Sequence, residues 1–176
     1  MVWLLLLPFA LHAAALLTDE FYFHHERGLP RWERIGHPLD TFTVLAGFYW
    51  ILFLPWSGAA LKIYLALAIF SCLFVTKDEW VHVRCCRGGE NWLHAILFLL
   101  HPVTFIMAAL IWPFLHGQAS PWLVLGEGDR FILQVAFPAF VGLTTLYWIY
   151  QILYWNWLRK APNPLAEGMN EKRTRH

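Results

Sequence analysis

Long apolar runs alternate with short polar stretches along the 176 residues of this chain. A helix needs about 20 residues to cross the hydrocarbon core of a bilayer, and five of the runs come near that length. We expect the shorter runs to continue as helix into the polar residues beside them. The pattern predicts an all-α, polytopic membrane bundle whose spans are Val2–Leu17, Thr41–Trp56, Ala59–Val75, Leu93–Leu115 and Phe131–Trp157.

Two polar stretches between the apolar runs follow one pattern. They are TDEFYFHHERGLPRWERIGHPLD at 18–40 and TKDEWVHVRCCRGGENWLH at 76–94. Each opens with an acidic pair followed by a histidine, passes through Arg and Gly, and closes with Glu-x-x-x-His. An even number of spans separates the copies, so the repeat is parallel. We expect one transmembrane bundle at 1–157, with repeat A at 1–57, repeat B at 58–116, a fifth helix at 131–157, and a flexible cytoplasmic tail at 158–176.

Composition narrows the class further. The chain is 59% hydrophobic and 14% charged, which is less charge than a soluble domain of this size needs to cover its surface. The net charge of +1 gives no reason to expect a nucleic-acid partner. The apolar runs make the lipid bilayer the expected partner. No basic segment precedes the first run, and we therefore expect that run to be retained rather than cleaved as a signal peptide.

The basic residues are unevenly distributed along the chain. Most of the 13 Lys and Arg residues flank the polar stretches or lie in the tail, whereas Lys62 and Arg130 lie on the opposite side. Basic residues stay preferentially in the cytoplasm. This asymmetry predicts cytoplasmic motif stretches and C-terminus and an outside N-terminus, as in a multi-pass protein of a bacterial-type inner membrane.

Carboxylates and histidines recur at helical spacing in both polar stretches. Residues three or four apart share one helix face, so each of four helix ends offers a carboxylate together with an imidazole. The core metal-ligand candidates are Glu20, His24, His25, Glu33, His37, Glu79, His82, Glu90 and His94. The same faces are extended by five additional candidates, which are Asp19, Asp40, Asp78, His12 and His101.

This donor set favours a metal centre. Carboxylate oxygen with imidazole nitrogen suits Fe, Mn or Zn, whereas thiolate-rich sites suit Zn or Cu(I). Four carboxylates and four histidines exceed what a single tetrahedral zinc ion needs. We therefore expect two metal ions, with Fe first and Zn or Mn as alternatives, bridged by carboxylates at the cytoplasmic end of the bundle.

The motifs resemble known di-iron proteins in ligand type. The Glu and His pairs at helix ends resemble the Glu/Glu-x-x-His sites inside ferritin-like di-iron bundles. They also resemble the histidine-rich sites of integral-membrane di-iron desaturases and hydroxylases. The spacing here is mostly Glu-x-x-x-His, and the His-x-x-His-His box is absent, because no third histidine accompanies His24 and His25 at that spacing. The resemblance covers the two polar stretches and implies no particular substrate.

The resemblance implies an O2-dependent oxidation, hydroxylation or desaturation of a hydrophobic or lipid substrate that enters from the bilayer. No nucleotide motif is visible, so a separate electron donor is expected, and no catalytic residue beyond the ligands is assigned. The alternatives are a metal-ion carrier or sensor, a zinc-dependent membrane lipid hydrolase, and a structural subunit of a larger complex.

Two further questions stay open: whether the charged residues bind a metal at all, and what role His12 and His101 have. The charged residues can instead form an Arg–carboxylate lattice with no metal, in which the partners are Arg27, Arg34, Arg84 and Arg87 with Asp19, Glu26, Asp78 and Glu90. His12 and His101 lie inside apolar spans, where an ionisable residue faces the bundle interior. Each of these two is either a neutral core histidine bonded to the backbone, or a ligand or proton relay.

Overall fold

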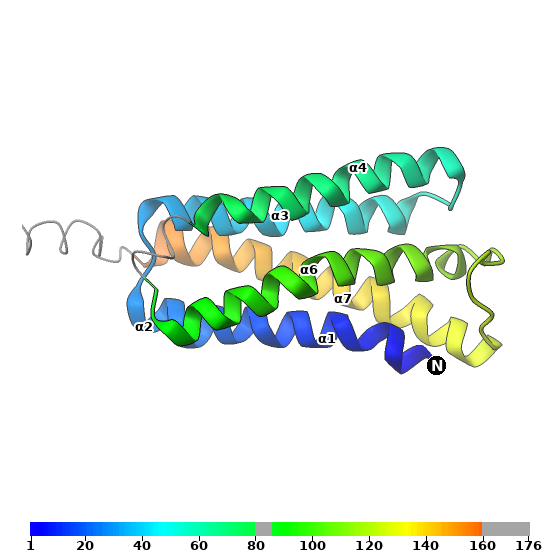
Figure 1. The fold of residues 1–176 in the computed structure, drawn as a ribbon, viewed down its shortest axis with the longest axis horizontal. Helices are drawn as coiled ribbons and strands as arrows, with labels where there is room; N and C mark the ends of the chain where they lie inside the picture. The colour runs from blue at the N-terminus through cyan, green and yellow to red at the C-terminus, as the bar shows by residue number, and fades with distance from the viewer. Residues whose placement is uncertain (80–85, 160–176) are drawn as a thin grey trace, which may run out of the picture.

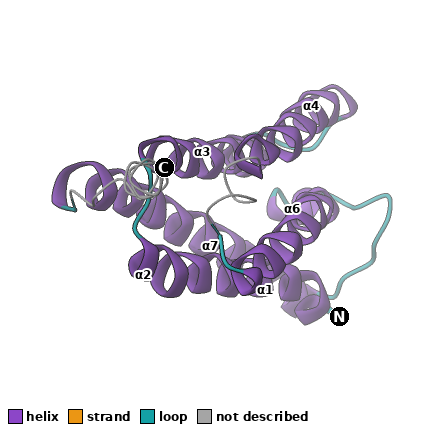
Figure 2. Ribbon diagram, turned by 60° about the vertical axis from the view of Figure 1, so that its left-hand side comes forward, coloured by secondary structure: helices purple, strands orange, loops and turns teal. Residues whose placement is uncertain are grey.

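The computed structural model describes residues 1–79 and 86–159, apart from the side chains of Arg27 and Asp78. Every regular element in this part of the chain is helical (Figure 2), which confirms the predicted all-α class. The elements are α1 Val2–Thr18, a π-helical turn Asp19–His24, α2 His25–Arg27, α3 Arg31–Phe53, α4 Gly58–Phe74, a 3-10 turn Val75–Asp78, α6 Gly88–Leu115, α7 Glu127–Leu153 and a second π-helical turn Tyr154–Leu158. The predicted tail lies almost wholly outside the described residues.

Four helical stretches are long and apolar enough to cross a membrane, and they are Val2–His24, Gly58–Lys77, Gly88–Leu115 and Glu127–Leu158. They correspond to four of the five predicted spans, and each extends beyond the apolar run into polar sequence. The remaining predicted span, Thr41–Trp56, corresponds to α3. This helix has 23 residues but carries four charged side chains in its N-terminal half, Arg31, Glu33, Arg34 and Asp40. Large apolar side chains such as Leu73, Leu99 and Leu146 are exposed, as expected of a surface that faces lipid.

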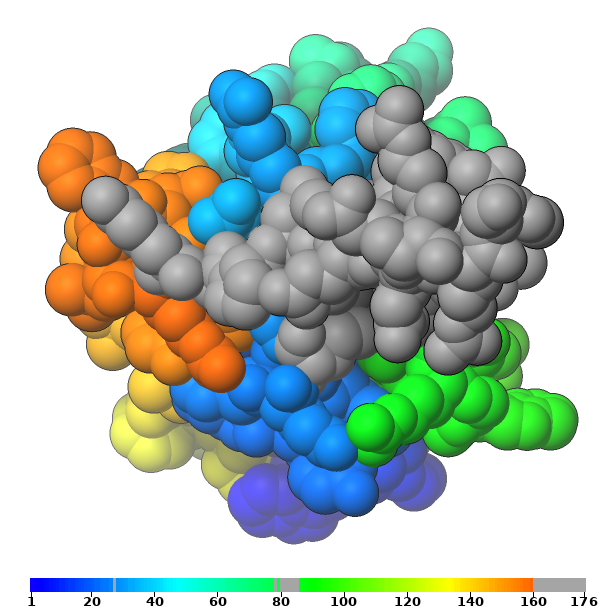
Figure 3. Space-filling view, turned by 90° about the vertical axis from the view of Figure 1, so that its left-hand side faces the viewer, coloured from blue at the N-terminus to red at the C-terminus, as the bar shows by residue number. Residues whose placement is uncertain are grey.

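The long helices run side by side along one axis (Figure 1). Helix α1 packs mainly against α6, and α3 packs against both α4 and α7. This arrangement brings α2, the starts of α3 and α6, and the end of α7 to one end of the bundle, while the N-terminus lies at the other. Figure 3 looks onto the first of these ends, where α2, the start of α6 and the end of α7 are visible together.

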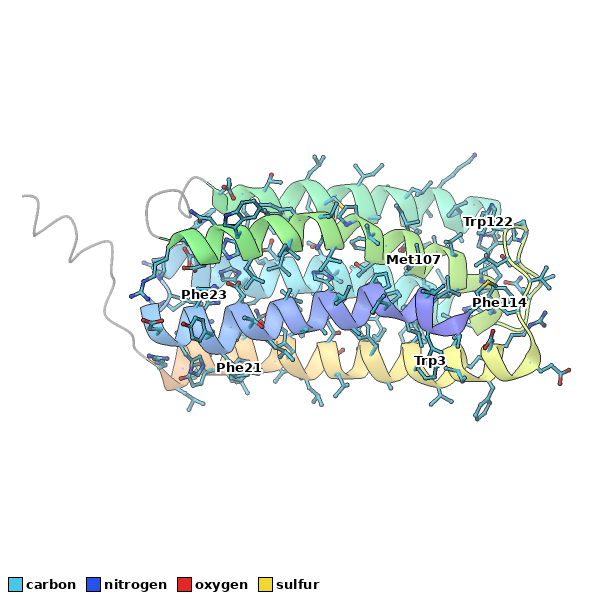
Figure 4. The ribbon with its side chains drawn as sticks, turned by 60° about the horizontal axis from the view of Figure 1, so that its bottom comes forward. Trp3, Phe21, Phe23, Met107, Phe114 and Trp122 are labelled. Atoms are coloured by element: carbon cyan, nitrogen blue, oxygen red, sulfur yellow. The ribbon has the colours of Figure 1, made fainter. Side chains whose placement is uncertain are left out.

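The apolar core lies toward the N-terminal end of α1, away from the polar stretches. Phe48 on α3 is at its centre, with ring centroids 6.0 Å from Phe9, 5.6 Å from Phe105 and 5.6 Å from Phe137. Helices α3 and α6 approach closely at Gly47, where a Cβ atom would lie 2.7 Å from the Phe105 ring. The side chains labelled in Figure 4 mark both ends: Phe21 and Phe23 lie at the polar end, and Trp3, Phe114 and Trp122 at the other.

Candidate metal centre

Helices α3 and α6 present the same pair of side chains at the same distance from their first residues. Glu33 and His37 are the third and seventh residues of α3, and Glu90 and His94 are the third and seventh of α6. A carboxylate in the first turn is stabilised by the unpaired amide groups of the helix N-terminus. Because residues four apart share a face, each helix directs one carboxylate and one imidazole into the bundle.

Helix α1 contributes three more polar side chains through the π-helical turn that follows it. Asp19, Glu20 and His24 all lie in this turn, and they are only 4%, 0% and 2% exposed. Turns of this kind inside longer helices are frequent at functional sites. The turn therefore carries two carboxylates and a histidine into the space between α3, α6 and α7.

Four buried residues form a first group of metal-ligating side chains. Asp19, His24, Glu90 and His94 each offer one donor atom, and these four atoms lie within 4.8 Å of one another. Asp19 Oδ1 is 3.1 Å from His94 Nε2, and Asp19 Oδ2 is 3.2 Å from His24 Nε2. Glu90 Oε1 is 4.0 Å from the same His24 nitrogen. Asp19 thus offers a different oxygen to each histidine.

A second group shares His24 with the first. It adds Glu33 and His37, and Glu33 Oε2 lies 3.9 Å from His37 Nε2. The His24 and His37 rings have centroids 4.7 Å apart. Burial lowers the pKa of His37, but the Glu33 carboxylate, with further help from Asp40 and Asp19, raises that pKa to about 9. In the metal-free protein, His37 therefore carries a proton at neutral pH.

The environment of His24 tests whether these donors fit a metal ion. Glu20 Oε2 lies 3.2 Å from His24 Nδ1 and accepts its hydrogen, which leaves Nε2 with a lone pair in the neutral ring. Nε2 faces Asp19 and Glu90, and no group in the described part of the chain makes a hydrogen bond with it. A lone pair beside two carboxylates is repulsive unless a proton or a metal ion lies between them. The carboxylate–histidine pair is also the arrangement that orients metal-bound histidines. The donors fit a metal ion.

Glu20 is held from its other side by the end of α7 and the π-helical turn that follows it. Its Oε1 accepts hydrogen bonds from Trp155 Nε1 at 2.5 Å and from the Tyr150 hydroxyl at 3.1 Å. Both oxygens of this fully buried carboxylate are therefore engaged, and Glu20 lies behind His24. Sequence reasoning did not select Tyr150 or Trp155, because aromatic residues near the end of a span usually pack or face lipid. The recurrence of Tyr147, Tyr150 and Tyr154 along one helix face could have indicated that this face contacts polar groups inside the bundle.

The remaining predicted ligands lie elsewhere. His25 hydrogen-bonds through Nε2 to the Tyr150 hydroxyl at 2.9 Å and stacks on Tyr154, so it belongs to neither group. Asp40 forms a salt bridge with Lys77 at 2.6 Å. Glu79 is exposed. His82 and the side chain of Asp78 lie outside the described residues.

A cavity of about 360 Å³ extends from the two groups into the bundle. Asp19, His24, His37 and His94 form its polar end. Most of the remaining wall is apolar and comes from α1, α3, α6 and α7, and the cavity reaches His12 and His101. The side chains that could ligate a metal are therefore also part of the wall of an apolar binding space.

The alternative Arg–carboxylate lattice is represented among the described side chains by Arg87 and Glu26, which lie 2.7 Å apart at the surface. Surface pairs of this kind contribute about 0–1 kcal/mol. The contacts of Asp19 are instead to histidines. Arg84 and the side chain of Arg27 lie outside the described residues.

No protein-family model, curated protein or solved structure matches this chain. The fold and the site alone define its class. It is a helical bundle with four membrane-length helices and, at one end, a buried cluster of histidines and carboxylates that could bind a metal.

Proposed function

We propose that this chain is an integral-membrane enzyme that holds two metal ions, iron first, and oxidises a hydrophobic substrate with O2 at the cytoplasmic face. The observation that carries the proposal is the continuity of the two ligand groups with the apolar cavity. Asp19, His24, His37 and His94 belong to both. A substrate in the cavity would therefore lie directly beside the metal.

The position of Asp19 supports two ions rather than one. Its two oxygens lie beside different histidines, His24 and His94, as a bridging carboxylate would require. His24 Nδ1 is engaged by Glu20, so His24 can donate Nε2 to only one ion. Glu90 and His94 then complete one ligand set, and Glu33 and His37 complete the other.

Each group of side chains at the site would have a separate role. Glu20 fixes the His24 ring, and the apolar wall excludes water from the substrate. Bound iron would supply the activation of O2, which carboxylate and imidazole ligands with open positions support. Electrons would come from a separate donor, because no nucleotide-binding motif is visible in the sequence.

Elemental analysis of the purified full-length protein tests the proposal. We expect about two Fe per chain for the unaltered protein and loss of iron in Asp19→Asn. The matched control is Asp129→Asn, because Asp129 lies near the N-terminal amine at the far end of the bundle, 3.8 Å from it. Iron retained in Asp19→Asn, or lost equally in both variants, would contradict the site.

Other outcomes would select the alternatives. Tightly held zinc with no iron would favour a zinc-dependent lipid hydrolase, with a metal-bound water as nucleophile. Rapid, reversible binding together with movement of the ion into liposomes would favour a carrier or sensor. O2 consumption that depends on an added hydrophobic compound would support the oxidase.

A further inference from the structure

Two histidines line the cavity deeper in the bundle than the metal centre. His12 precedes Asp19 by seven residues on α1, and His101 follows His94 by seven on α6, which corresponds to roughly 10 Å along a helix. Their rings meet edge to face with centroids 5.6 Å apart, and both side chains are 5% exposed. Ionisable residues at such depth face the bundle interior and mark function.

The hydrogen bonds around His101 define which of its nitrogens carries the proton. Thr43 donates its only hydroxyl hydrogen to the Asp40 carbonyl at 2.8 Å. Ser71, 2.7 Å from the Thr43 oxygen, must therefore donate to it. The Ser71 oxygen is then left to accept from His101 Nε2 at 3.0 Å. The neutral His101 ring thus carries its hydrogen on Nε2 and keeps a lone pair on Nδ1.

The same reasoning applies to His12. Thr104 donates its hydroxyl hydrogen to the His101 carbonyl at 2.8 Å, so it can only accept from His12 Nδ1, which lies 3.5 Å away. His12 then keeps a lone pair on Nε2. Both histidines therefore present acceptors, and within residues 1–79 and 86–159 no protein group donates to either nitrogen.

We propose that the cavity binds a hydrophobic alcohol, with its hydroxyl donating to His101 Nδ1 and its apolar chain reaching toward the metal centre. This names the substrate class of the proposed enzyme and rests on that function for its chemistry, although not for the binding itself. A ketone or an alkane has no hydrogen to donate. A charged amine would have to leave water for the apolar cavity. Neither group of metal ligands found in the described residues includes His12 or His101.

Binding to the metal-stripped, full-length protein in lipid nanodiscs tests the inference. The probes are dodecan-1-ol, dodecan-2-one and dodecane, which share one chain length, and native mass spectrometry reports the bound fraction. We expect the alcohol to bind about fivefold more tightly than the ketone or the alkane, the gain of a single net hydrogen bond. Equal affinities for the three probes would overturn the proposal.

Variants locate the hydroxyl. His101→Phe should reduce the preference for the alcohol. Ser71→Ala frees the hydrogen on His101 Nε2, which a ketone oxygen can accept, so the ketone should then bind as tightly as the alcohol. The matched control is Tyr64→Phe, which removes another buried hydrogen bond, from the Tyr64 hydroxyl to the Phe105 carbonyl, outside this cavity. An unchanged preference in His101→Phe and Ser71→Ala would overturn the assignment. Because these measurements use no metal, a failed iron analysis and a failed alcohol preference are separate results.

Discussion

At the scale of single residues, Asp19 and Glu20 are neighbours in sequence but have different surroundings. Asp19 lies between His24 and His94 and belongs to a ligand group. Glu20 lies behind His24, where Trp155 and Tyr150 hold its second oxygen. The sequence made Glu20 a core ligand candidate and Asp19 an additional one, whereas in the structure Asp19 belongs to a ligand group and Glu20 to neither. The sequence could not give this order, because it depends on which residues of α6 and of the end of α7 lie opposite each carboxylate.

Replacing Glu20 with Gln should weaken metal binding without removing the site. A carboxylate that orients a metal-bound histidine typically contributes a factor of about 10–100 in metal affinity. We therefore expect Glu20→Gln to lower iron affinity by about that factor in a chelator competition while the number of ions at saturation stays unchanged. The exposed Glu26→Gln serves as the control. Loss of a whole ion in Glu20→Gln would instead make Glu20 a direct ligand.

The elevated pKa of His37 predicts a pH-dependent affinity. Below a pKa of about 9, the ring must lose a proton before it can bind a metal, so affinity should rise with pH and level off near pH 9. Isothermal titration in buffers of different ionisation enthalpy would measure the protons released. His37→Gln should bind iron more weakly and release fewer protons. Equal proton release by His37→Gln and the unaltered protein would contradict the assignment.

At the scale of helices, the repeated Glu-x-x-x-His motif was informative. It predicted that Glu33 and His37 would lie on one face of α3, and Glu90 and His94 on one face of α6, and the structure brings both pairs into the ligand groups. The opening of the repeat is less informative. Asp19, Glu20 and His24 are buried, whereas Glu79 is exposed. Similar sequence does not imply similar burial, because Trp155, in the π-helical turn after α7, covers the first copy.

The contact between α3 and α6 at Gly47 gives a test of the packing. In Gly47→Ala the new methyl group would lie 2.7 Å from the Phe105 ring, which must then move within a filled core. Overpacking of this kind costs about 1–3 kcal/mol. We expect a lower midpoint in thermal unfolding in detergent. Gly142→Ala is the control, because no atom lies within 4 Å of the added methyl group and its helix propensity improves.

At the scale of the whole molecule, the sequence predicted the helical class and the four membrane-length helices, together with a fifth span, Thr41–Trp56, that is not among them. It also predicted that carboxylates and histidines gather at one end. It did not predict the cavity, since the volume left between α1, α3, α6 and α7 depends on how side chains such as Phe48 and Phe140 fill the interior. A linear pattern gives the face on which a residue lies but not the space left in front of it.

Metal should stabilise the entire bundle, because the ligands come from α1, α3 and α6. An ion present at 100 times its dissociation constant adds about 2.7 kcal/mol to the free energy of unfolding. We expect Fe²⁺ to raise the unfolding temperature and a chelator to reverse the rise. His94→Ala removes a ligand from one of the two proposed sets and should reduce the shift, whereas His116→Ala, in the loop at the other end of the bundle, should keep it in full. A shift preserved in His94→Ala would argue against the centre.

The hydrogen bond between Trp155 and Glu20 joins residues 135 positions apart in the chain. During biosynthesis, Asp19, His24, Glu33, His37, Glu90 and His94 are all made well before Trp155 leaves the ribosome. A nascent chain that stops before α7 would have every ligand but not the group that anchors Glu20 behind His24. On the proposed function, metal insertion should therefore be a late step in the protein's maturation, after α7 has docked.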